Sequence, residues 1–121
     1  MKKILVVDDS ATVRQQVNLA LTQGGFQVVE AEDGVAGLEA VAKGGVAMII
    51  CDVNMPRMNG LEMLENLRRD PQHTTLPVVM LTTEGQPALV ERAKKAGAKG
   101  WIVKPFKADL MIAAVKKLVG A

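Results

Sequence analysis

Short apolar runs alternate with longer segments of helical periodicity along all 121 residues of the chain. The run from Ala47 to Cys51 contains no polar residue, which is typical of a strand buried on both faces of a parallel sheet. Similar runs recur at regular intervals. Together they predict strands at Lys3–Val7, Gln27–Ala31, Ala47–Cys51, Pro77–Leu81 and Lys99–Val103.

The segments between these runs place apolar residues on one helical face. The first two segments end at pairs of glycines, which are common at helix C-termini. Asn59, with Glu62 three residues later, has the pattern of a capping box and predicts the start of the third helix. The expected helices contain the apolar stripes Val13–Leu21, Val35–Ala42, Leu61–Leu67, Leu89–Ala96 and Leu110–Val119.

This alternation predicts an α/β fold built from parallel βαβ units with right-handed crossovers. Ligands of such sheets bind beyond the carboxyl ends of the strands. Polar residues stand at several of these ends: Asp8, Asp9, Asp52, Thr82 and Lys104. The sequence therefore predicts a polar site at one edge of the sheet.

Carboxylates brought close together repel one another unless a cation joins them. Asp8, Asp9 and Asp52 suit Mg²⁺, which prefers oxygen ligands. A free carboxylate oxygen can then attack phosphorus and form an acyl phosphate, while Lys104 and Thr82 contact the oxygens of the transferring group. Taken singly, each residue could be a turn, a cap or a surface side chain. Together they predict Mg²⁺-dependent phosphoryl transfer.

The composition predicts one folded domain spanning residues 1–121, with 49% hydrophobic residues and a mean hydropathy of +0.17. Apolar stretches fall short of the roughly 20 residues of a membrane span, and we expect neither a signal peptide nor a membrane partner. The single cysteine, Cys51, allows no internal disulfide and fits a reducing compartment. We therefore expect a cytoplasmic protein.

Charge is distributed unevenly between the two parts of the chain. Residues 1–83 carry 7 Lys and Arg against 10 Asp and Glu, whereas residues 84–121 carry 8 against 3. The basic part is either a solvated surface or a face for an acidic partner. Nucleic acid is disfavoured as a partner because the basic residues form no continuous run and only 2% of residues are aromatic.

Four motifs together resemble those of two-component response-regulator receiver domains: Val7–Ser10, Asp52–Gly60, Leu81–Glu84 and Lys104–Phe106. They occur in the order and spacing of that family, and the resemblance covers the whole chain. It implies a flavodoxin-like (βα)5 fold, with a doubly wound parallel sheet in the order 2-1-3-4-5. The resemblance is strongest toward single-domain chemotaxis regulators, so we expect no effector domain.

The resemblance also implies a role for each site residue. Asp52 would accept a phosphoryl group from the phosphohistidine of a histidine kinase. Asp9 and Asp52 would bind Mg²⁺ together with the backbone carbonyl of Asn54, and Asp8 would assist through water. Lys104 would pair with the phosphoryl oxygens. Beyond self-phosphorylation and autodephosphorylation, we expect no enzymatic activity.

A conformational switch is implied as well. Thr82 would move toward a phosphoryl oxygen, and Trp101 would swing inward from a position where the family usually carries Tyr or Phe. Ordinary strand packing is the alternative for this indole. The peptide bond before Pro105 would be cis, and Asn54 and Glu84 would tune dephosphorylation.

Two biological roles compete within this family. In chemotaxis, the phosphorylated form would bind a flagellar-motor switch protein, which the segment of residues 96–107 favours. In a phosphorelay, the chain would pass its phosphoryl group to a histidine phosphotransfer protein. Either role permits a phosphatase, and we expect a monomer.

Two remoter functions fit the sequence less well. A Mg²⁺-dependent aspartyl phosphohydrolase of the haloacid-dehalogenase type needs Asp-x-Asp after the first strand, whereas Asp8 and Asp9 are adjacent. An FMN carrier of the flavodoxin type needs a phosphate loop there, and these two carboxylates would repel a phosphate.

The last predicted helix carries apolar residues on more than one stripe, beyond the arc of about 100° that one-sided packing needs. With Lys107, Lys116 and Lys117 nearby, it predicts an apolar patch rimmed by positive charge. The alternative is that small Ala and flexible Met simply tolerate exposure.

Overall fold

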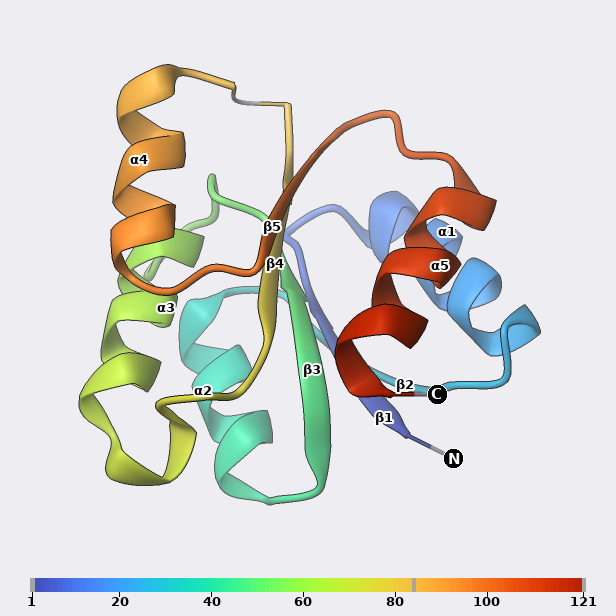
Figure 1. The fold of residues 1–121 in the computed structure, drawn as a ribbon, viewed down its shortest axis with the longest axis horizontal. Coiled ribbons are helices and arrows are strands. Elements are labelled where there is room, and N and C mark those ends of the chain that lie inside the picture. Colours follow the sequence, from blue (N-terminus) through green and yellow to red (C-terminus); the bar gives the residue numbers. More distant parts are fainter. Residues whose placement is uncertain (1, 84, 121) are drawn as a thin grey trace.

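The computed structural model describes residues 2–83 and 85–120, and its centre is a five-stranded parallel sheet (Figure 1). The strands lie side by side in the order β2-β1-β3-β4-β5. This confirms the predicted doubly wound α/β fold and its strand order. The strands are β1 (Lys3–Val7), β2 (Gln27–Ala31), β3 (Val46–Cys51), β4 (Val78–Thr82) and β5 (Gly100–Val103).

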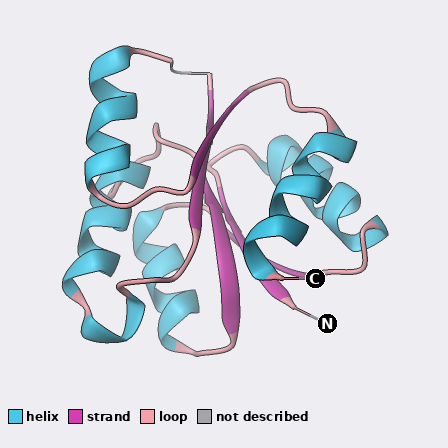
Figure 2. Ribbon diagram, in the orientation of Figure 1, coloured by secondary structure: helices cyan, strands magenta, loops and turns pink. Residues whose placement is uncertain are grey.

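Helices cover both faces of the sheet (Figures 1 and 2). Helices α1 and α5 lie on one face, and α2, α3 and α4 lie on the other. A short 3₁₀ turn, η1 (Pro71–His73), follows α3. The helices are α1 (Ala11–Gln23), α2 (Gly34–Ala42), α3 (Gly60–Arg69), α4 (Pro87–Lys95) and α5 (Ala108–Val119).

Alternate residues of the central strands enter two separate cores. Leu5 and Val7 of β1 pack toward α2, α3 and α4, whereas Ile4 and Val6 pack toward α1 and α5. Strands β1, β3 and β4 are buried along almost their whole length. Their carboxyl ends are therefore held rigidly, and so are the polar residues that follow them.

The observed boundaries differ from the predicted ones by a residue or so. The predicted strand Pro77–Leu81 in fact begins at Val78, because Pro77 has no N–H to donate to the ladder. It continues through Thr82, which pairs with Val103 of β5. Thr82 is thus the last residue of a strand and not the first residue of a loop.

The predicted capping box at the start of α3 is present. Asn59 Oδ1 accepts a hydrogen bond from the Glu62 backbone N–H at 2.9 Å, and Glu62 Oε1 accepts one from the Asn59 N–H at 3.0 Å. Ser10 similarly caps α1 by accepting a hydrogen bond from the Val13 N–H. The N-termini of both helices are therefore fixed by side-chain caps.

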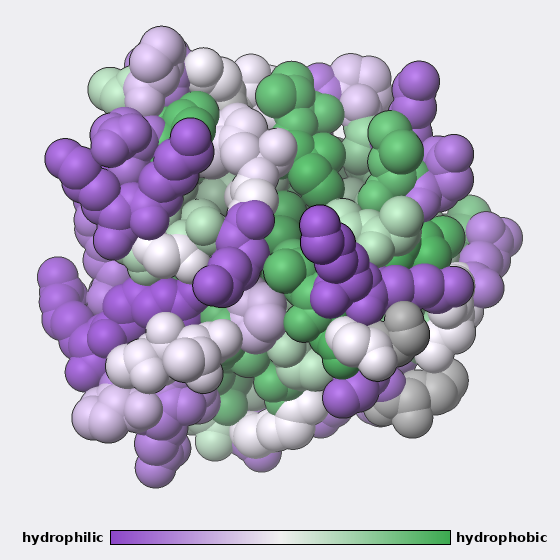
Figure 3. Space-filling model, viewed as in Figure 1, coloured by the Kyte–Doolittle hydropathy of each residue, from purple (hydrophilic) through white to green (hydrophobic). Residues whose placement is uncertain are grey.

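The apolar residues of α5 mostly serve packing. Met111 and Val115 are buried, and Ile112 is half-buried against the same core. Leu110 is 64% exposed and Val103 is 54% exposed. Apolar surface is visible between α4 and α5 in Figure 3. The exposed patch is thus smaller than the sequence pattern suggested. Within the described residues, no helix combines the length and apolar character needed to cross a bilayer.

Replacing Gly60 by Ala should destabilise the protein by about 1–3 kcal/mol or more, because the new Cβ would overlap the carbonyl oxygen of Asp52. Gly100→Ala is the matched control, since its Cβ would meet Val79 at an ordinary 3.5 Å and should change stability by at most about 1 kcal/mol. Urea denaturation measures both free energies of unfolding. Equal stabilities for the two variants would contradict the close packing at Gly60.

Candidate functional site

The polar residues predicted from the strand ends converge at one edge of the sheet. Strands β1 and β3 are neighbours, so Asp8 and Asp9 lie next to Asp52, and oxygens of the three carboxylates lie within 4.8 Å of one another. The sheet hydrogen bonds continue into the site: the Asp52 N–H donates to the Val7 carbonyl at 2.9 Å. The site is therefore an extension of the sheet itself.

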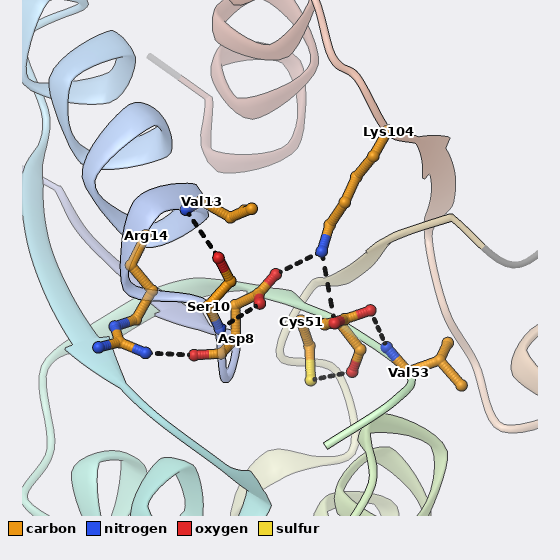
Figure 4. A network of polar contacts seen from close by, with 8 residues as sticks. Asp8, Ser10, Val13, Arg14, Cys51, Val53 and Lys104 are labelled. Atoms are coloured by element: carbon orange, nitrogen blue, oxygen red, sulfur yellow. Dashed lines mark hydrogen bonds and ion pairs between the residues drawn. The ribbon is translucent and has the colours of Figure 1, made fainter.

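Lys104 reaches this cluster from the end of β5. Its Nζ lies 2.7 Å from Asp8 Oδ2 and 3.4 Å from Asp52 Oδ2 (Figure 4), and its side chain is only 15% exposed. Burial lowers the pKa of Lys104, but the hydrogen bond that Lys104 donates to Asp8 and the charge of Asp52 outweigh this effect, so the pKa is raised. Lys104 is thus an ammonium that bridges two carboxylates.

Asp52 is nearly buried, with 9% of its side chain exposed. Its Oδ1 accepts a hydrogen bond from the Val53 backbone N–H at 2.7 Å, which leaves Oδ2 facing Lys104. Burial raises the pKa of Asp52, and so does the charge of Asp8; Lys104 and a hydrogen bond from Thr82 offset only part of this rise. Burial and the neighbouring Asp8 thus both disfavour the ionised form of Asp52.

Asp8 is anchored by contacts that the sequence did not predict. Its Oδ1 accepts a hydrogen bond from the Ser10 N–H at 2.9 Å, and its backbone carbonyl accepts one from the Arg14 guanidinium (Figure 4). Arg14 also pairs with Glu30, with Nε 3.1 Å from Oε1. The signal in the sequence was an arginine one helical turn after the cap residue Ser10.

The three carboxylates fit a hard divalent cation. Mg²⁺ prefers oxygen ligands, binds to few carboxylates and keeps several waters. Asp9 is exposed and can take part from the solvent side, whereas Asp8 and Asp52 are buried. A cation there would also supply the positive charge that the cluster lacks.

The remaining predicted site residues differ in how far they are buried. Thr82 is buried at the end of β4, and Asn54 is exposed on the loop that follows β3. Trp101 is half-buried and packs on the face of the sheet that carries α4. The Lys104–Pro105 peptide bond is cis. Glu84, expected to tune dephosphorylation, lies outside the described residues.

A doubly wound parallel sheet with an acidic cluster and a lysine at its carboxyl edge is an arrangement found in a class of signalling domains. The family model described as response regulator receiver domain matches residues 4–116. The chain therefore belongs to the response regulator receiver family, as the resemblance of its motifs implied.

Similar proteins extend this assignment. A chemotaxis protein CheY homolog of Campylobacter jejuni is 41% identical over 120 residues, which span 98% of this chain and 92% of the relative. The structure of the chemotaxis protein CheY4 of Vibrio cholerae is 39% identical, covers 98% of both chains and superimposes with a TM-score of 0.91. A CheY-like receiver domain protein of Methanospirillum hungatei, at 23% identity, covers 99% of this chain and 94% of its own, with a TM-score of 0.93, and shows the common fold alone.

The raised pKa of Asp52 predicts a specific pH dependence of stability without divalent cations. Because the folded state holds this proton more tightly, the stabilisation is present below the unfolded value of about 3.8 and is lost as pH rises through the higher folded pKa. Asp52→Asn cannot lose a proton in this range. The difference in unfolding free energy, wild type minus variant, should therefore fall as pH rises from 4 toward neutrality.

Urea denaturation at successive pH values measures the difference in unfolding free energy between wild type and Asp52→Asn. Excess Mg²⁺ should make this difference fall less steeply with pH, because the ion binds to the ionised carboxylates. A difference that stays constant with pH would mean that Asp52 has an ordinary pKa in the folded protein.

Proposed function

We propose that the chain is a phosphorylation-controlled switch in which Asp52 accepts a phosphoryl group from the phosphohistidine of a histidine kinase. The observation that carries this proposal is the position of Asp52 within 3.4 Å of the Lys104 ammonium and beside two further carboxylates. Asp52 Oδ2 would attack phosphorus in line with the P–N bond of the phosphohistidine. That bond breaks, and the imidazole leaves with its proton, so that an acyl phosphate remains on Asp52.

The chain's own residues prepare this transfer. The hydrogen bond from the Val53 N–H orients the Asp52 carboxylate, and burial keeps competing water away from it. Lys104 can exchange part of its contact with Asp8 for the incoming phosphoryl oxygens, which carry more charge. Asp9, Asp52 and the Asn54 carbonyl would hold Mg²⁺, with Asp8 acting through water. The bound cation would neutralise charge on the transferring group.

A pocket beside Lys104 supports approach of a protein phosphodonor. Its volume is about 440 Å³. Residues from α1, the end of β4 and the start of the β5–α5 loop line it: Val13, Gln16, Thr83, Lys104, Pro105 and Phe106. The pocket is largely apolar and opens directly onto the lysine, so a partner that covers it can bring its phosphohistidine to Asp52.

The output of the switch follows from Thr82 and Trp101. Thr82 is buried beside Asp52, so a phosphoryl group on Asp52 gives its hydroxyl a new, dianionic acceptor. Trp101 lies on the neighbouring strand and is half-buried; in this proposal its indole takes a second position, on the surface between α4 and α5, when Thr82 moves. Movement of the two side chains would change that surface and with it the affinity for a partner.

Of the two roles open to such a switch, chemotaxis is favoured. Relatives of 39–41% identity are described as chemotaxis proteins over nearly their whole length. The basic residues of the C-terminal part, near the exposed Val103 and Leu110, suit an acidic and apolar partner such as a flagellar-motor switch protein. Transfer from Asp52 to a histidine phosphotransfer protein is the second candidate.

Incubation with a small phosphodonor such as phosphoramidate and Mg²⁺ should add one phosphoryl group per chain, visible by mass spectrometry of the intact protein. Asp52→Asn should abolish this addition, because among the described residues no other carboxylate contacts both Lys104 and the Val53 N–H. Chelation of Mg²⁺ should slow the reaction strongly. Undiminished labelling of the variant would place the nucleophile elsewhere.

A pull-down from a lysate, with and without beryllofluoride and Mg²⁺, distinguishes the two roles. In chemotaxis, a motor-switch protein should be captured only from the activated wild-type protein and not by Asp52→Asn. Capture of a histidine phosphotransfer protein, with no motor component, would instead identify a phosphorelay intermediate.

A further inference from the structure

The loop between β3 and α3, residues 53–59, contains a strained turn. Arg57 has φ = 64°, and among the described residues it is the only non-glycine with a positive φ. The Met58 N–H donates to the Pro56 carbonyl at 2.7 Å, so Arg57 is the central residue of a three-residue turn. Such turns with positive φ are rare and cost about 1–3 kcal/mol, so other contacts must hold them in place.

The side chain of Arg57 supplies such a contact. Its Nε lies 2.7 Å from Asp33 Oδ2, and the Asp33 side chain is only 3% exposed. The other oxygen of Asp33 caps α2 by accepting a hydrogen bond from the Ala36 N–H at 2.9 Å. The hydrogen bond from Arg57 and that from Ala36 lower the pKa of Asp33, so the acid is ionised and fixed at neutral pH. One end of this ion pair is thus buried and immobile, unlike that of an ordinary surface pair.

The backbone of the loop also contacts α2, the helix that Asp33 caps. The Gly34 N–H donates to the Met58 carbonyl at 3.1 Å, and a Cβ at Gly34 would come within 2.7 Å of that oxygen. At the other end, the Gly60 N–H donates to the Val53 carbonyl at 2.9 Å. The loop is therefore fastened both to α2 and to its own start, and Asn54 lies between these attachments.

We propose that Arg57 is a positioning residue for the metal site: its ion pair with Asp33 holds residues 53–59 in the conformation that presents Asn54 to Mg²⁺. This inference rests on the proposed function, in which the Asn54 carbonyl is a ligand. Mg²⁺ tolerates little deviation from ideal geometry, so a loop free to relax its strained turn binds the ion less well. Contacts beyond the direct ligands commonly tune metal affinity in this way.

Titration of the purified protein with Mg²⁺, followed by backbone amide NMR, tests the proposal without phosphorylation. Arg57→Met, which keeps the length of the side chain, should weaken Mg²⁺ binding about tenfold, the lower end of the range for contacts beyond the ligands. Asp33→Asn should weaken it similarly, and the double variant should be no weaker than either single one, because both remove the same contact. Arg92→Met is the control: it removes an ion pair with Glu65 of 2.7 Å, on α3 and α4, and should leave Mg²⁺ affinity unchanged.

Arg57→Gly separates positioning from stability. Glycine adopts a positive φ without strain, so the free energy of unfolding should be retained. It cannot form the ion pair with Asp33, and its backbone is more flexible, so the loop is no longer held in one conformation and Mg²⁺ affinity should still fall. Wild-type Mg²⁺ affinity in folded Arg57→Met and Arg57→Gly would overturn the proposal. Absence of Mg²⁺ binding by the wild-type protein, or wild-type affinity in Asp52→Asn, would instead contradict the proposed function.

Discussion

The repulsion between buried carboxylates is the constraint on which the rest of this structure depends. Asp8 and Asp52 lie at the ends of adjacent buried strands, with the exposed Asp9 beside them, and Lys104 is the ammonium that bridges the two buried acids. Burial raises the pKa of Asp52 and the charge of Asp8 raises it further, because the single positive charge of Lys104 offsets these effects only in part. Negative charge therefore exceeds positive charge at this edge of the sheet. A divalent cation would supply positive charge there, and the resulting site would suit a phosphoryl group.

The fold maintains this unfavourable arrangement because its charged residues are held by different strands of the sheet. β1, β3 and β5 deliver the charged residues to one edge, while separate cores on the two faces keep those strands from spreading apart. The small residue Gly60 lets α3 begin directly against the Asp52 carbonyl. The backbone around Asp52 therefore has little freedom to relax. A change of charge at Asp52 must be accommodated by movement of nearby side chains. In the proposed switch, Thr82 and the half-buried Trp101 would move in this way and would connect the site to the surface between α4 and α5.

Much of this arrangement could be predicted from the sequence, because strand ends in a parallel sheet share an edge. The apolar runs located the five strands within a residue or so, and the polar residues that follow them form the observed cluster. Loop conformation could not be predicted in this way. Nothing in the residues around Arg57 indicates a positive φ or a partner 24 positions away in Asp33. The exposure of α5 was also misjudged, because periodicity does not reveal how far Ile112 and its neighbours reach into the core.

The most direct test of the account is to locate the phosphoryl group after reaction with phosphoramidate. Reduction of the acyl phosphate with borohydride converts the modified aspartate to homoserine, which peptide mass spectrometry assigns to one position. Homoserine is expected at residue 52 alone, and only when Mg²⁺ is present. Homoserine at residue 8 or 9, or equal labelling of Asp52 without Mg²⁺, would contradict the claim that an uncompensated carboxylate cluster controls this site.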